Sequence, residues 1–141
     1  MQIDWTVDTD LSHVEILAPT DAAGVTPITS ASFDMRTLPP GCRIFLILSA
    51  DVSLTGAIAH GVTFSVNDTT VEADGTAEDT GWLPAKTHGS LAKLTALGEL
   101  GVSVEVAPGG LRPFLQVVAT GDDAATLYSV SARLIALPRE L

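Results

Sequence analysis

The sequence predicts an all-β protein, an antiparallel β-sandwich or jelly roll with at most one short helix. Apolar and polar residues alternate with a period of two along most of the chain, as in strands with one buried face. Clusters of Gly, Pro and Asp separate these stretches at short intervals and favour turns. Short strands divided by such turns indicate a sandwich rather than alternating strands and helices. The 141 residues fit one domain, 1–141.

The first expected strands lie in the N-terminal half. Alternation begins with Ile3, Trp5 and Val7 and resumes at Val14 and Ile16. Residues 20–29 are the only linker-like stretch, so residues 1–30 form either an extended N-terminal arm or the first part of the sandwich.

The next expected strands complete the sheets. Residues 43–48 are apolar on both faces, which predicts a central strand, and residues 62–66 alternate again. In the final third, a three-stranded antiparallel meander is expected over residues 102–107, 112–120 and 126–137.

A single helix is considered between residues 90 and 98. Ser90 could cap a turn that carries Leu91, Leu94 and Leu97, and Gly98 would close it. Because glycines surround this segment, an extended loop is the alternative.

The charge excludes several classes of partner. The net charge is −10, with seven Lys and Arg residues against seventeen Asp and Glu residues. Nucleic acids and anionic membranes attract basic surfaces, so neither is an expected partner. The N-terminus has no basic and apolar leader pattern, and no apolar run is long enough to span a membrane. The single Cys42 excludes a disulfide within the chain, so synthesis in a reducing cytoplasm is expected.

No pattern predicts an enzyme, a cofactor or a metal centre. His13, His60 and His88 lack the spacing of zinc ligands, and no Gly-x-Ser-x-Gly elbow is present. The acidic loop over residues 67–81 leaves calcium binding open, although its spacing differs from the EF-hand loop. Trp82, in a Gly-Trp-Leu-Pro loop, could line a sugar platform. A carbohydrate-binding β-sandwich module is therefore one alternative function.

The order of segments carries a resemblance to a known family. The chain opens with MQIDWTVDTDLS, continues through ITSASFDM and LPPGCRIFLILSADVS, and closes with GVSVEVAPGGLRPFLQVVATGDDAATLYSVSARLI. In this layout it resembles the capsid cement, or head decoration, proteins of tailed bacteriophages, of the small all-β type. The middle, residues 56–98, departs from that pattern. Another phage β-protein, such as a head fibre base or tail component, is thus a further alternative.

The resemblance implies a non-enzymatic virion protein. Such a protein would bind the outer surface of a capsid and stabilise its lattice. Its partners would be the major capsid protein and further copies of itself in a homotrimer. From the residues, Ile135 and Leu137 fall on the nominally polar face of the last strand and favour self-association. Ile3, Trp5 and Val7 give residues 2–11 an apolar edge suited to adding a strand to another sheet, with Trp5 as anchor. Residues 20–29 would then be the tether, and the alternative is a first strand of the chain's own sandwich.

Overall fold

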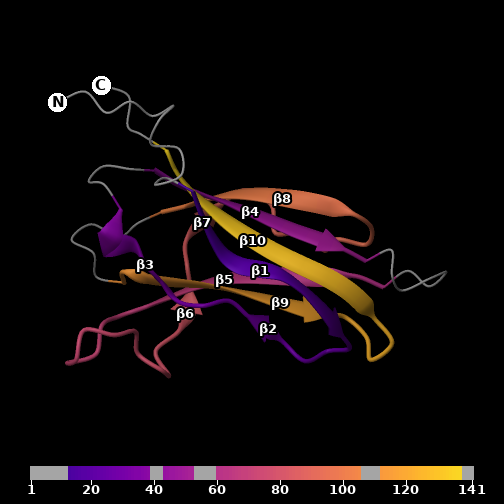
Figure 1. Cartoon of the computed structure of the whole chain (residues 1–141), viewed down its shortest axis with the longest axis horizontal. Coiled ribbons are helices and arrows are strands. Elements are labelled where there is room, and N and C mark those ends of the chain that lie inside the picture. The colour runs from indigo at the N-terminus through magenta and orange to yellow at the C-terminus, as the bar shows by residue number, and fades with distance from the viewer. Residues whose placement is uncertain (1–12, 39–42, 53–59, 106–111, 138–141) are drawn as a thin grey trace.

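A computed structural model describes residues 13–38, 43–52, 60–105 and 112–137 and shows two antiparallel sheets packed as a sandwich (Figure 1). Each sheet has five strands. The predicted all-β sandwich is therefore confirmed. Among the described residues, no helix is long and apolar enough to cross a membrane.

The first sheet, sheet A, contains the longest strands. Its order is β1 (His13–Ala23), β10 (Leu127–Leu137), β4 (Arg43–Asp51), β8 (Gly98–Val104) and β7 (Thr87–His88). All neighbours are antiparallel. β4 lies in the middle of the sheet, which confirms the central strand predicted from its apolar run.

The second sheet, sheet B, is built around two long strands. β9 (Phe114–Gly121) pairs with β5 (Val62–Thr69) along its whole length. β2 (Ile28–Thr29) and β3 (Phe33–Asp34) pair with different parts of β9, and β6 (Leu83–Pro84) pairs with the end of β5.

The predicted meander in the final third is wrong in its connectivity. β8, β9 and β10 all form, but β8 and β10 belong to sheet A and β9 belongs to sheet B. Even within sheet A, β4 separates β8 from β10. Turn residues mark where a strand ends, whereas the sheet that the next strand joins depends on pairing partners distant in sequence.

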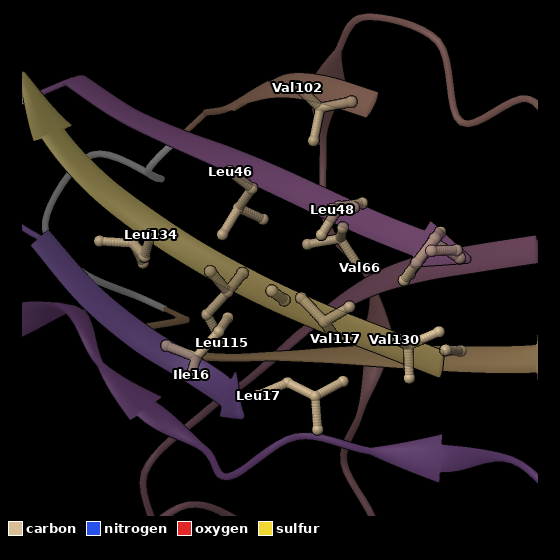
Figure 2. Packing of buried hydrophobic residues seen from close by; sticks show 14 of the residues in the cluster. Ile16, Leu17, Leu46, Leu48, Val66, Val102, Leu115, Val117, Val130 and Leu134 are labelled. Carbon is tan, nitrogen blue, oxygen red and sulfur yellow. The ribbon is translucent and has the colours of Figure 1, made fainter. Parts of the chain in front are cut away.

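The core lies between the sheets and follows the predicted alternation. Leu46 and Leu48 of β4 and Leu134 of β10 face Leu115 and Val117 of β9, and all five are fully buried (Figure 2). Full burial of one such side chain contributes roughly 1.5–3 kcal/mol relative to an exposed one. The contact between these residues holds the two sheets together.

The linker predicted over residues 20–29 is wrong for most of its length. Residues 20–23 continue β1, and the register shifts of β1 against β10 fall just before them. Gly24 then turns the chain with a φ of 76°, and β2 follows in the other sheet. Residues 13–30 therefore contribute strands to both sheets and do not form an extended arm. The rest of the arm considered over residues 1–30, residues 1–12, lies outside the described residues.

The segment from residue 90 to 98 is extended rather than helical. The backbone N–H groups of Val62 and Leu94 each donate to the other's carbonyl oxygen, both at 2.9 Å, and Gly98 already begins β8. The described residues instead contain a three-residue 3₁₀ turn, η2 (Met35–Thr37). The Asp34 carboxylate caps it by accepting from the Arg36 backbone N–H at 2.9 Å.

Candidate functional site

Three apolar side chains gather on the outer face of sheet A. The core-facing residues of β4 alternate with Phe45 and Ile47, which therefore face away from the core. Phe45 pairs across the sheet with Ile135 of β10, and Ile47 pairs with Arg133. Phe45, Ile47 and Ile135 are all half-buried. These three residues are called the apolar patch below.

A glycine beside the apolar patch gives the Phe45 ring its place. Gly101 of β8 pairs with Ile47, one row along from Phe45. A Cβ atom on Gly101 would lie 2.5 Å from Cζ of Phe45, which is closer than two non-bonded carbon atoms can approach. The tip of the ring therefore occupies the space above the glycine.

Charged side chains border the apolar patch. Arg43 is exposed and Arg133 is half-buried, and Arg133 Nη2 lies 4.0 Å from Oε1 of Glu99. On β8's far side, Glu105 Oε2 lies 3.1 Å from both Nζ of Lys86 and Nε2 of His88. The Lys86 ammonium and then the His88 ring lower the pKa of Glu105 below its usual value. The apolar patch is thus an island within a polar rim, which is the usual anatomy of a protein–protein contact.

A shallow hollow continues the outer face toward the other end of sheet A. Its volume is about 380 Å³, and small or polar residues of β4, β8 and β10 form most of its lining: Ser49, Asp51, Gly98, Glu99, Ser129 and Ser131. Leu97 stands beside it with 78% of its surface exposed. The Ser49 hydroxyl donates to Glu99 Oε1 at 3.3 Å. The hollow holds no aromatic ring of the kind that a sugar platform needs.

The residues predicted to bind partners do not form one site. Ile135 lies in the apolar patch, and the Cα atom of Leu137 pairs with that of Arg43 at the end of the same strand. Trp82 is half-buried and precedes β6, at an edge of sheet B. Trp82 therefore lies beside sheet B, whereas Ile135 is part of sheet A.

The other predicted contact residues, Ile3, Trp5 and Val7, lie outside the described residues, as does the whole of residues 2–11.

Phe45 and Ile47 were missed as surface residues, although the sequence held a signal for them. Residues 43–48 are apolar on both faces, and a sheet in a two-layer sandwich has only one face toward the core. One set of alternating side chains in that run must therefore point outward. The run predicts a central strand, and it also predicts an apolar outer surface.

In the acidic loop over residues 67–81, the carboxylates of Asp68 and Asp74 bind different residues of the same chain. Asp68, at the end of β5, is bound by Arg112, whose Nε donates to the carboxylate and whose Nη2 donates to the backbone carbonyl. Asp74 accepts from the hydroxyl and the backbone N–H of Thr76, and these bonds lower the pKa of Asp74. Within the described parts of the chain, no three His, Cys, Asp or Glu side chains come together to hold a metal ion. The loop geometry gives calcium binding no support.

A second ionic cluster secures the turn between β9 and β10. Asp122 accepts from Nζ of Lys93 at 3.2 Å and from the hydroxyl of Thr126 at 3.0 Å, and Nδ1 of His60 lies 3.6 Å away. The Gly61 backbone N–H, with smaller contributions from Thr126 and Lys93, lowers the pKa of Asp122 to about 2. Asp122 therefore joins three segments of the chain at one end of the sandwich.

Replacing Asp122 by Asn is expected to lower the melting temperature at neutral pH and to have little effect near pH 2. The folded state holds the pKa of this carboxyl at about 2, below its ordinary value of 3.8. Its contribution is therefore present above pH 3.8 and is lost as the pH falls toward 2. Thermal melts of both proteins from pH 7 to 2 measure the difference. A gap of constant size across that range would contradict the assignment.

Comparison with protein-family models, with curated proteins and with solved structures finds no match to this chain.

Proposed function

We propose that this protein is a capsid cement protein, which binds the outer surface of a phage capsid and stabilises its lattice without catalysing a reaction. The observation that carries the proposal is the apolar patch on the outer face of sheet A. The segment layout quoted above, which resembles head decoration proteins, supports the same function. The proposed partners are the major capsid protein and further copies of this chain, as a homotrimer.

The apolar patch suits contact with a broad protein surface rather than with a small molecule. Its three side chains lie on adjacent strands of a sheet, and the tip of the Phe45 ring lies over Gly101. Small-molecule sites are usually concave and enclose most of the ligand. Aromatic residues at the centre of a polar rim often supply most of the binding energy of a protein interface. Burying Phe45, Ile47 and Ile135 under a partner would remove their remaining apolar surface from water.

The polar rim fits the same role. Arg43, Arg133 and Glu99 carry opposite charges beside the apolar patch, so they can fix the orientation of a partner. Exposed charge pairs contribute more to specificity and association rate than to affinity. On this proposal, the apolar residues supply the affinity and the rim selects the partner.

Substituting Ile47 by Asp is expected to weaken binding to capsids at least tenfold while leaving the fold intact. A carboxylate in the apolar patch would have to lose its water when a partner covers the patch, and tenfold corresponds to about 1.4 kcal/mol. Co-sedimentation with purified shells that lack this protein measures binding, and circular dichroism checks the fold.

The matched control is Ser65→Asp. Ser65 is an exposed position on β5, so this substitution adds the same charge to the outer face of sheet B. The control is expected to bind as the unaltered protein does. Equal binding by both variants would exclude the apolar patch as the attachment surface, and failure of the unaltered protein to bind shells would refute the capsid function itself.

A further inference from the structure

His60 lies against the turn between β9 and β10, with both of its ring nitrogens near carboxylates. Nδ1 lies 3.6 Å from Oδ1 of Asp122, and Nε2 lies 3.8 Å from Oδ1 of Asp123. The His60 side chain is only 13% exposed, so solvent screens the charge of this ring less than that of an exposed one. The ring therefore lies between two acidic side chains of one turn.

The backbone beside His60 is tied to the same turn. The Asp122 backbone N–H donates to the carbonyl of Gly61 at 3.0 Å. The aliphatic part of Lys93 lies over Gly61, where an added Cβ atom would be 2.6 Å from both Cγ and Cδ of the lysine. These contacts hold the backbone that carries the His60 ring opposite the two carboxylates.

The charged groups around the ring come from two segments. The β9–β10 turn supplies the carboxylates of Asp122 and Asp123. The segment between β7 and β8 supplies Lys93, whose Nζ lies 3.2 Å from Oδ2 of Asp122. Residues 53–59, which precede His60 in the sequence, contain no Asp, Glu, His, Lys or Arg. One ammonium group thus stands against two carboxylates, and a negative charge is left without a partner beside the imidazole.

The two contacts of the ring make different demands on its protonation state. A neutral imidazole carries one N–H group, and its other nitrogen has a lone pair that accepts hydrogen bonds. Ionised carboxylates only accept, so a neutral ring can present an N–H group to only one of the two aspartates. A protonated ring presents an N–H group to each, and it supplies the missing positive charge.

We propose that His60 is a pH-sensitive latch, whose protonated ring bridges Asp122 and Asp123 and locks the β9–β10 turn to the start of β5. β5 and β9 belong to sheet B and β10 belongs to sheet A. The latch therefore acts where the chain passes from one sheet to the other. It operates in the free protein and does not depend on the proposed function.

The latch closes on the acidic side of neutrality. An imidazole ordinarily changes its charge between about pH 8 and 5. Asp122 stays ionised over that whole range, because its pKa is lowered to about 2. The two ion pairs exist only when the chain is folded and the ring is protonated. The stability that they contribute is therefore present at the acidic end of the range and is lost as the pH rises through it.

Thermal melts of the unaltered protein and of His60→Gln, at pH 8 and at pH 5.5, test the latch. Glutamine keeps a polar side chain that does not titrate. The gap in melting temperature between the two proteins is expected to be about 2–4 °C larger at pH 5.5 than at pH 8.

The matched control is His88→Gln. Nε2 of His88 lies 3.1 Å from Oε2 of Glu105, but the His88 side chain is 65% exposed. Exposed ion pairs contribute little to stability, so this variant is expected to show nearly the same gap at both pH values.

A second variant leaves the ring in place and serves if His60→Gln fails to fold. Asp123→Asn removes one of the two carboxylates at a position whose side chain is 51% exposed. Its gap to the unaltered protein is also expected to be larger at pH 5.5 than at pH 8. Gaps that are equal at both pH values, or larger at pH 8, would overturn the proposal. A pH-dependent gap for His88→Gln as large as that for His60→Gln would overturn it as well.

Discussion

Replacing Leu46 by Ala is expected to lower the free energy of unfolding by about 2–5 kcal/mol, the range for a large apolar residue removed from a close-packed core. Leu46 is fully buried at the centre of β4, which is itself the central strand of sheet A. Side chains from both sheets surround it, so they cannot move together to fill the space (Figure 2). Urea unfolding followed by circular dichroism measures the loss.

The neighbouring residue provides the control for Leu46. Ile47→Ala removes a similar side chain from the same strand, but from the half-buried outer face. Its loss is expected to be clearly smaller, because little cavity forms at a surface open to solvent. Equal losses for the two variants would mean that the outer face is as tightly packed as the core. That result would contradict the half-buried position of Ile47 on the outer face of sheet A.

The second large effect is expected from Arg112→Met, at about 3 kcal/mol, the lower part of the range for breaking a buried ion pair. The Asp68 side chain is 13% exposed and that of Arg112 is 25% exposed. Arg112 binds both the carboxylate and the backbone carbonyl of Asp68, so its removal leaves a buried charge and a buried carbonyl without this partner. Chemical unfolding of the variant gives the size of the effect.

Two further variants separate charge burial from simple loss of contact. Adding Asp68→Asn to Arg112→Met removes the unpaired charge and is expected to restore part of the lost stability. Arg36→Met breaks the more exposed ion pair between Arg36 and Asp34, whose side chains are 47% and 29% exposed, respectively. This substitution is expected to lower the free energy of unfolding much less. A loss for Arg36→Met as large as that for Arg112→Met would show that burial is not the cause.

The strands of this fold could be predicted from the sequence because each one depends on local alternation. Val62 to Val66 and the stretch before Leu137 have an unmistakable period of two, and both form strands with one buried face. The partners of each strand could not be predicted in the same way. β10 lies between β1 and β4, and no local feature of Tyr128 or Val130 specifies those neighbours. Pairing is decided by how whole faces pack, which is a property of the folded chain.

The candidate site was only partly predictable for a related reason. Ile135 was identified because an apolar residue interrupts a polar face within one strand. Its neighbours Phe45 and Ile47 come from a strand about ninety positions earlier, and only the register between β4 and β10 brings them together. The place of Gly101 beneath the Phe45 ring likewise depends on the register between β4 and β8. A surface built from three strands appears in the sequence as unrelated fragments.

The pairing of β1 with β10 has a consequence for synthesis on the ribosome. His13 and Val14 of β1 pair with Ile135 and Leu134 of β10. β1 is therefore made well before its partner, which is the last of the described strands to emerge. Translation proceeds at about 5–20 residues per second, so the nascent chain carries an unpaired β1 for several seconds. One edge of β4 also stays unpaired until β10 has been made. Sheet A therefore closes only after β10 has emerged, and a chain stalled before residue 127 is expected to expose two unpaired strand edges to chaperones.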